Sequence, residues 1–195
     1  MILSQTRPQL AFDGMEAPAL ALGRCHEITG PGRRSMAALV AGRVAGPVLW
    51  IQAVRDTARL DPEGLHPLAD PGRLVVLRGI RQVEGLWATE EALRAGAVPC
   101  VVLETATAPA LTPVRRLNLA AVAGGETAPA PPLCLILLPE GGAAGAVETR
   151  WWADPLPAQT APRWRLSLLR DKAGPPGCWT ATVAGRQARF TREAV

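Results

Sequence analysis

The residues with the clearest chemical meaning form one short loop. It consists of Gly30, Pro31, Gly32, Arg33, Arg34 and Ser35. A working phosphate loop has the pattern G-x-x-x-x-G-K-[ST], in which backbone amides surround the phosphates, the Lys supplies charge and the hydroxyl binds magnesium. Here the loop is short and contains no Lys. We therefore expect the scaffold of a nucleotide site without its chemistry.

The flanking segments predict the elements that position this loop. Residues 25–29 (CHEIT) alternate like a strand, and a helix is expected to begin near Ser35, a suitable N-cap, with an apolar stripe through its first turns. Gly46-Pro47 ends that helix, and residues 48–51 (VLWI) form a short apolar run typical of a buried parallel strand. Strand, turn, helix and strand follow one another as in an α/β domain.

Length and charge narrow the classes of function. The chain has 195 residues, a formal net charge of +4 and a pI of about 9.4. One domain of this size can bury a substantial core. The basic balance permits nucleic-acid contact without requiring it, because no block of five or six basic residues occurs.

The four cysteines indicate buried free thiols in a reducing compartment. Cys25, Cys100, Cys134 and Cys178 are widely spaced and form no C-x-x-C pair, so neither a metal site nor a disulfide framework is expected. No signal peptide or membrane span is recognisable, and we expect a cytoplasmic protein.

The remaining chain predicts a single domain with four regions. Residues 1–22 are expected to be an irregular arm, 23–147 a parallel α/β core, 148–190 an antiparallel edge and 191–195 a tail. Within the core, strands are predicted at 73–78, 99–104 and 133–138, and a helix at 84–95. A second helix is predicted with Thr112 as its N-cap and Pro113 at its first position, and it runs to Gly124-Gly125. Three strands are predicted after Glu148, joined by Pro/Gly turns.

The order of these elements resembles the RecA-type ATPase core, over roughly residues 11–190. The segments that carry it are GRCHEITGP, EEALRAGAVPCVVLETATAPALTP and RWRLSLLRDKAGPPGCWTAT. Within that superfamily the chain resembles the ImuA family through LWATEEALRAG, RRLNLAA, TRW and RWRL. The resemblance implies a RecA-like three-layer α/β/α core with a mostly parallel sheet. It also implies a role in SOS-induced translesion synthesis with ImuB and an error-prone C-family polymerase as partners, and contact with DNA or RecA as a further option.

The resemblance also indicates that the nucleotide site is degenerate. The position matching the water-activating Glu holds Gln52, which cannot act as a general base, and the magnesium-supporting Asp is replaced by Glu104. Together with the missing Lys, these departures predict a protein that hydrolyses no nucleotide and needs no cofactor or metal. The alternative is a weak, unconventional ATPase in which Arg33 or Arg34 replaces the Lys.

A set of arginines and tryptophans forms the candidate partner or DNA surface. Its members are Arg115, Arg116, Arg150, Trp151, Arg163, Trp164 and Arg165. Such residues can stack bases and hold phosphates, and they also anchor protein interfaces. For the Trp and Arg residues of the late strands we favour a combined role in the core and in a partner surface over direct DNA binding, because the segment matching the RecA DNA loop, residues 140–146, carries no positive charge. A third hypothesis is an inhibitory partner in the damage response, similar in outlook to induced cell-division inhibitors.

Overall fold

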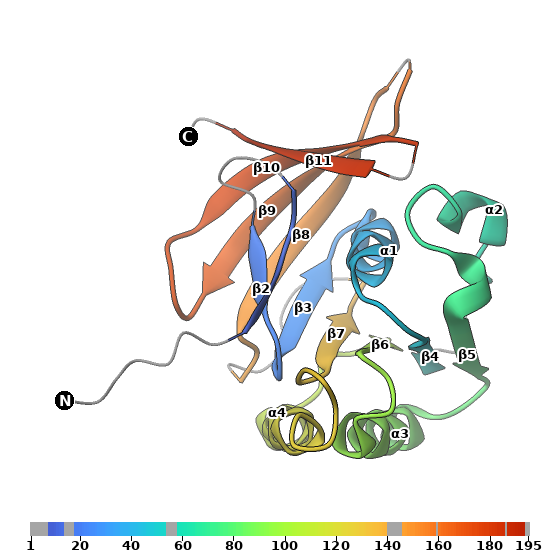
Figure 1. The fold of residues 1–195 in the computed structure, drawn as a ribbon, viewed down its shortest axis with the longest axis vertical. Helices are drawn as coiled ribbons and strands as arrows, with labels where there is room; N and C mark the ends of the chain where they lie inside the picture. Colours follow the sequence, from blue (N-terminus) through green and yellow to red (C-terminus); the bar gives the residue numbers. More distant parts are fainter. Residues whose placement is uncertain are drawn as a thin grey trace.

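A computed structural model describes residues 8–13, 18–53, 58–139, 146–158, 160–185 and 187–193. Its centre is a nine-stranded sheet with the order β11-β10-β9-β8-β3-β7-β6-β4-β5 (Figure 1). Strands that follow one another along the chain are separated in the sheet at three points: β3 from β4, β5 from β6, and β7 from β8. The parallel pairs are joined through helices, as their crossover connections require. β3 is the fifth of the nine strands, so the loop that follows it lies beside the middle of the sheet.

The parallel half of the sheet contains the most apolar strands. These are β3 (Cys25–Thr29), β4 (Val48–Ala53), β5 (Leu74–Arg78), β6 (Cys100–Thr105) and β7 (Leu133–Leu137). Every residue of β3, β6 and β7 is buried, as is typical of strands covered on both faces.

The C-terminal half of the sheet is antiparallel. It contains β8 (Thr149–Leu156), β9 (Arg163–Asp171), β10 (Gly177–Ala184) and β11 (Gln187–Arg192). β8 runs parallel to β3 and antiparallel to β9, so it joins the two halves. Buried residues alternate with more exposed ones along β8, β9 and β10, which indicates strands covered on one face.

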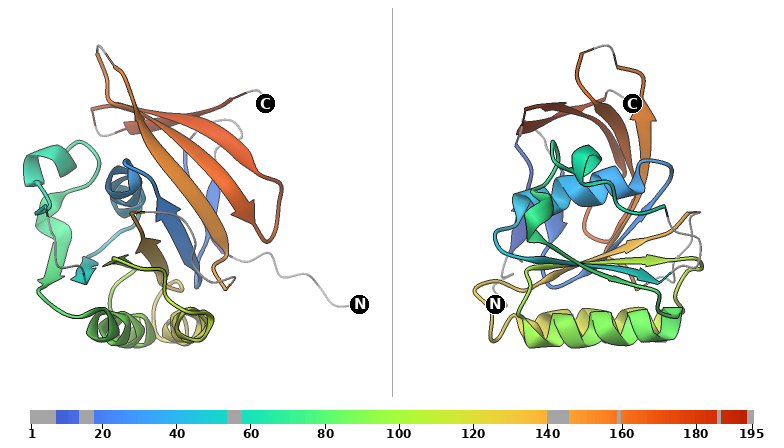
Figure 2. Two further views of the ribbon diagram at one scale, coloured as in Figure 1. Left: turned by 180° about the vertical axis from the view of Figure 1, so that it is seen from behind. Right: turned by 90° about the vertical axis from the view of Figure 1, so that its right-hand side faces the viewer.

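Helices cover the two faces unequally. α1 (Arg33–Arg43) lies on one face, where the bent C-terminal strands curve around it, and α3 (Gln82–Ala95) and α4 (Leu111–Gly124) lie side by side on the other (Figures 1 and 2). A short helix α2 (Pro62–Leu65) and a 3-10 turn (Pro71–Arg73) precede β5. The α/β fold class, with a mostly parallel sheet and an antiparallel C-terminal edge, is confirmed.

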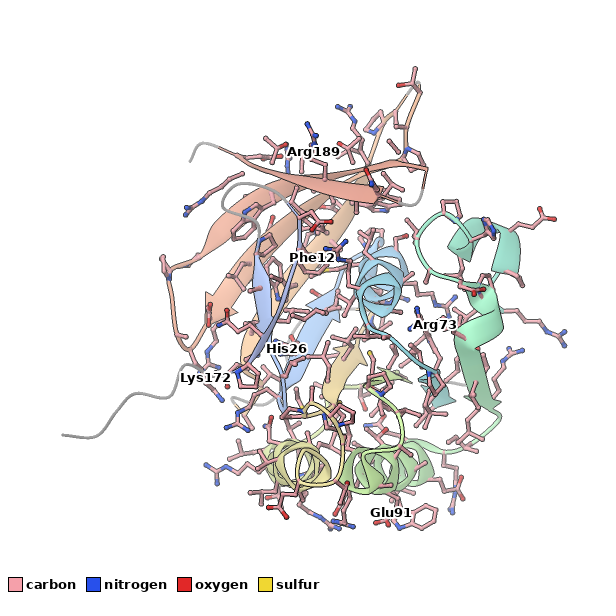
Figure 3. The ribbon with its side chains drawn as sticks, in the orientation of Figure 1. Phe12, His26, Arg73, Glu91, Lys172 and Arg189 are labelled. Atoms are coloured by element: carbon pink, nitrogen blue, oxygen red, sulfur yellow. The ribbon has the colours of Figure 1, made fainter. Side chains whose placement is uncertain are left out.

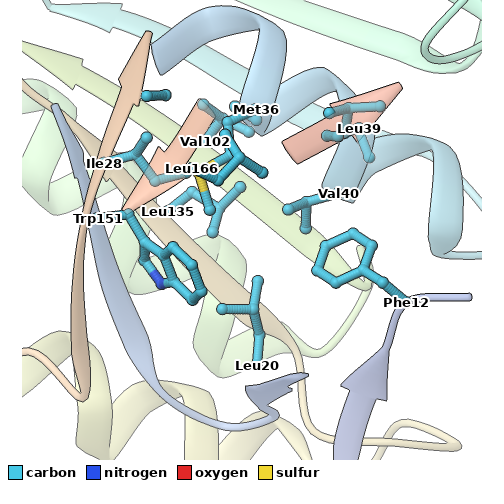
Figure 4. Packing of buried hydrophobic residues seen from close by; sticks show 14 of the residues in the cluster. Phe12, Leu20, Ile28, Met36, Leu39, Val40, Val102, Leu135, Trp151 and Leu166 are labelled. Atoms are coloured by element: carbon cyan, nitrogen blue, oxygen red, sulfur yellow. The ribbon is translucent and has the colours of Figure 1, made fainter. Parts of the chain in front are cut away.

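Two apolar clusters correspond to the two faces. The first packs α1 against the curved sheet and includes Met36, Leu135, Trp151 and Leu166 (Figure 4). The second lies between the sheet and the α3–α4 layer and includes Ile51. Deletion of a buried side chain such as these costs about 2–5 kcal/mol.

The sequence missed three strands and misplaced the starts of two helices. The N-terminal arm contains a hairpin of β1 (Gln9–Ala11) and β2 (Ala19–Ala21), and β11 is a fourth late strand beyond the three expected. Helix α1 begins at Arg33 after Gly32, so Ser35 is inside the helix and caps nothing. Helix α4 likewise begins before Thr112, which is not its N-cap. In both helices the first turn lacks a side-chain cap.

The expected burial of the cysteines is confirmed for three of the four. All four thiols are free; those in β3, β6 and β7 are buried, and Cys178 in β10 is partly exposed. Burial raises the pKa of Cys100, which makes that thiol unreactive at neutral pH. No helix in the described part of the chain is long and apolar enough to cross a membrane.

Candidate functional site

The loop after β3 is held tightly against β8. Gly30 has φ +89°, a conformation that favours glycine, and a Cβ there would lie 2.5 Å from the carbonyl oxygen of Ala153. A Cβ on Gly32 would lie 3.0 Å from the Trp164 ring. Glycine is therefore needed at both positions for the loop to lie this close to β8 and to the Trp164 ring.

Two amides of this loop, those of Gly32 and Arg33, bond to carbonyl groups of the chain. Pro31 has no N–H, Gly32 N–H donates to Ala153 O at 2.8 Å, and Arg33 N–H donates to Gly30 O at 3.2 Å. In a phosphate loop the corresponding amides point at the anion. Here Gly32 and Arg33 have already satisfied theirs internally.

The charge of Arg34 in this loop is also matched internally. Arg34 holds Glu104 through Nε, at 3.0 and 3.1 Å from the two carboxylate oxygens, and through Nη2 at 2.7 Å from Oε2. Trp50 Nε1 donates to Glu104 Oε1 at 2.6 Å, and Gln52 Nε2 does so at 3.4 Å. The Glu104 side chain is 5% exposed and that of Arg34 is 25% exposed. We call Arg34, Trp50, Gln52 and Glu104 the loop cluster.

The loop cluster brings together three positions that the sequence singled out. Gln52 and Glu104 are register partners on β4 and β6, and Arg34 reaches them from α1. The Oε1 atom of Gln52 is buried without a hydrogen-bond partner among the described residues. Arg33 points elsewhere: its Nη1 donates to Gly30 O at 3.1 Å, and burial lowers its pKa. The arrangement contains a cation, Arg34, neutralised by the carboxylate of Glu104.

The expected surface of interleaved Trp and Arg residues does not exist as one face. Trp151 is fully buried and Trp164 is 9% exposed, so both belong to the core beside α1. Arg163 and Arg165 flank Trp164 on β9 and lie exposed on the opposite face. The two-residue period of a strand separates the two residue types, because successive side chains point to opposite faces. Trp151 and Trp164 are therefore corrected from surface to core residues.

The remaining arginines of that set have separate surroundings. Arg150 pairs with buried Glu27 at 2.7 Å, across the β3–β8 register. Arg116 pairs with Glu90 of α3 at 2.9 Å. Burial alone would raise the pKa of Glu90, but hydrogen bonds from Arg116 and Arg94 lower it. These arginines join elements of this chain.

Arg115 lies instead beside a groove of about 830 Å³ on the outer side of α4. Arg24, which precedes β3, and Lys172, which follows β9, also line it (Figure 3 labels Lys172). Sequence reasoning missed these two cations because they are distant along the chain and belong to no motif. In the described residues, no group of three or more His, Cys, Asp or Glu side chains could hold a metal ion. Most of the segment matching the RecA DNA loop, residues 140–145, lies outside the described residues.

One histidine is buried in β3, the strand that precedes the loop. His26 of β3, labelled in Figure 3, contacts Thr149 Oγ1 at 2.6 Å and the carbonyl of Ala21 at 2.9 Å. Burial lowers its pKa to about 4. Its two ring nitrogens are occupied within the fold, which makes it a structural residue.

Comparison with known proteins identifies the family. No protein-family model matches the chain. Protein ImuA from Caulobacter vibrioides, in strains NA1000 and CB 15, is 33% identical over 190 aligned positions, which cover 82% of this chain and 75% of that protein. This identity spans most of both sequences, and the chain therefore belongs to the ImuA family.

Proposed function

We propose that this protein is a non-hydrolysing, RecA-like adaptor in SOS-induced, error-prone translesion DNA synthesis, and that it assembles with ImuB and the error-prone C-family polymerase. Membership of the ImuA family supports the process. We call residues 30–35 the closed loop, because the Gly32 amide and the Arg34 guanidinium already bond within the chain. The closed loop supports the absence of catalysis. The interpretation of the molecule as an adaptor follows from these two together, because a fold that retains its surfaces without its nucleotide chemistry can still bind partners.

The single observation that carries the proposal is the bond between Arg34 and Glu104. A nucleotide phosphate would need the guanidinium that Glu104 already holds in a bidentate pair. Releasing Arg34 would leave a carboxylate buried without its charge partner, which is unfavourable. The neighbouring amide of Gly32 would also have to leave Ala153 O.

Binding of ImuB tests the adaptor role directly. Purified protein and ImuB from the same cassette are mixed and passed over a sizing column, with and without the C-family polymerase. We expect a complex that forms equally well with no nucleotide, with ATP and with ADP. Failure to form a complex under all of these conditions would overturn the adaptor role.

The alternative function, a weak ATPase, is tested by a substitution in the same loop. If Arg33 replaced the missing Lys, turnover would be measurable and Arg33→Ala would abolish it. We expect wild-type protein and Arg33→Ala to release phosphate at the same background rate. The contact of Arg33 with Gly30 O favours a structural role for this side chain.

Direct contact with nucleic acid is a second candidate function, favoured by one row of residues on the outer face of the C-terminal strands. Arg163, Thr182 and Arg189 are register partners across β9, β10 and β11. Exposed arginines and hydroxyls on a sheet can bind phosphates. A labelled single-stranded oligonucleotide tests this role: binding that weakens with salt and is lost in Arg163→Ala/Arg189→Ala would support it.

A further inference from the structure

The groove beside α4 lies where the helical layer ends. α4 packs over β3 and β7, and α3 over β4 and β6. Beyond α4, none of the described helices covers the outer face of β8 and β9 (Figure 1). The groove lies at this end of the helical layer, between α4 and the residues that precede β8 and follow β9. A further helix placed here would continue the α3–α4 layer.

One wall of the groove is apolar and unusually exposed. Leu111, Leu119 and Val122 of α4 line it and are 39%, 71% and 45% exposed. Their spacing places them on one side of the helix. From the first to the last is about 16 Å along the axis, or three helical turns, because each residue rises about 1.5 Å.

The groove also carries an excess of positive charge. Arg24, Arg115 and Lys172 line it together with one carboxylate, Glu148. Glu148 lies 3.8 Å from Arg24 Nε and 3.7 Å from Lys172 Nζ. No acidic partner of Arg115 is present in the described part of the chain. Three cations against one carboxylate favour an acidic ligand.

The floor of the groove is built by hydrogen bonds. The side chain of Asn118 accepts from Cys25 N–H and donates to Ala146 O, both at 2.9 Å. Lys172 Nζ donates to the same carbonyl at 3.0 Å. These bonds tie α4 to the start of β3 and to Ala146, and they tie Ala146 to the turn after β9, so the groove is formed before any partner arrives.

We propose that this groove receives an acidic, amphipathic helix of about three turns from a partner protein. Apolar anchors on one face of that helix would pack on Leu119 and its neighbours, and carboxylates would face Arg115 and Lys172. Helix-in-groove binding uses this combination of anchors and flanking charge. The exposed leucines favour a protein partner over a nucleic acid. The inference rests on the proposed function, since the adaptor role supplies the partner.

The experiment compares the affinity of matched variants for full-length ImuB from the same cassette. Leu119→Asp and Arg115→Glu alter the groove. Val83→Asp on α3, where the native side chain is 63% exposed, and Arg59→Glu make the same chemical changes outside it. We expect both groove variants to weaken binding at least 10-fold and both controls to stay within 2-fold. Circular dichroism and melting temperature confirm that each variant is folded.

Peptides of about 15 residues that tile the ImuB sequence identify the segment. We expect an acidic, amphipathic peptide to bind wild-type protein and to lose affinity for Arg115→Glu. If a basic peptide, or a single-stranded oligonucleotide, is what depends on Leu119 and Arg115, the inference is overturned.

The outcomes separate the inference from the function. If wild-type protein binds ImuB and the groove variants bind equally well, the groove is not the interface and the adaptor role stands. If wild-type protein binds neither ImuB nor the polymerase, the adaptor role fails and the groove loses its partner as well.

Discussion

The two ends of β3 have opposite surroundings. At the carboxyl end, the loop of residues 30–35 is packed on β8, and its arginine is held by Glu104. At the amino end, Arg24 opens onto a groove of about 830 Å³ with exposed leucines and excess positive charge. A RecA-like protein that binds nucleotide would leave the first region available. In this protein the first region is occupied by its own side chains, and no described residue fills the second.

This contrast separates stability from binding. Buried, paired groups resist substitution because removing one partner leaves the other without compensation. Exposed groups contribute little to folding and are free to contribute to recognition. Substitutions in the loop cluster should therefore destabilise the protein, whereas substitutions of exposed groove residues such as Leu119 should mainly change its affinity for partners.

The largest expected effect is at Glu104. Glu104→Ala leaves Arg34 and the Trp50 N–H without their common acceptor, and we expect the free energy of unfolding to fall by about 4 kcal/mol. Urea denaturation measures this loss. Glu91→Ala, which removes a half-exposed partner of Arg94, is the control and should cost far less, because exposed ion pairs add little to stability. Equal effects at both positions would remove the evidence for a tightly closed loop.

The next effect is a dependence of stability on pH. The pKa of His26 is lowered by burial from 6.5 to about 4, so folding favours the neutral ring. Its stabilising contribution is complete above pH 6.5 and is lost as the pH falls toward 4, up to about 3 kcal/mol. Unfolding curves between pH 7 and 4 measure it. A His26→Gln variant should lose less stability over that range, and an identical pH slope would contradict the assignment.

Alanine substitutions at two glycines, one in the loop and one outside it, test how closely the loop approaches β8. Gly30→Ala introduces both left-handed strain and a clash with Ala153 O, and we expect it to cost about 3 kcal/mol. Gly79 has φ +74° and no atom within 4 Å of the position that a Cβ would take, so Gly79→Ala should cost only about 1 kcal/mol. Thermal melts give the difference. Similar costs would mean that the loop does not press on the strand.

The smallest effect on stability is expected in the groove. Leu119 is 71% exposed, so Leu119→Asp should change the free energy of unfolding by less than about 0.5 kcal/mol. The same variant should weaken ImuB binding at least 10-fold. A large loss of stability would show instead that the groove wall is part of the core.

The sequence predicted most of the parallel core because local signals agreed there. Apolar runs such as residues 133–138 are bounded by Gly and Pro, and each run became a strand. The strand β5 differs from the others in being largely exposed. β11 was missed because it mixes polar with apolar residues, and the β1–β2 hairpin because each of its strands has only 3 residues. Helix starts were misplaced because α1 and α4 begin without a side-chain cap, although Ser35 and Thr112 suggested one.

The site was less predictable because it depends on distant pairs. The sequence identified Arg34, Gln52 and Glu104 separately, but 70 positions separate Arg34 from Glu104, and only the fold brings them together. Trp164 and its arginine neighbours were assigned to one surface, whereas the pleat of β9 places them on opposite faces. The groove combines Arg24, Arg115 and Lys172 from three parts of the chain, and no local pattern connects them.

Nucleotide titration tests the closed loop most directly. Wild-type protein is titrated with a fluorescent ATP analogue and magnesium up to millimolar concentration, and phosphate release is followed in the same sample. We expect no saturable binding, no turnover and no rise in melting temperature with ATP. Saturable binding that is lost in Arg34→Ala would show that the guanidinium leaves Glu104 for a phosphate, and would contradict a non-hydrolysing adaptor with a closed loop.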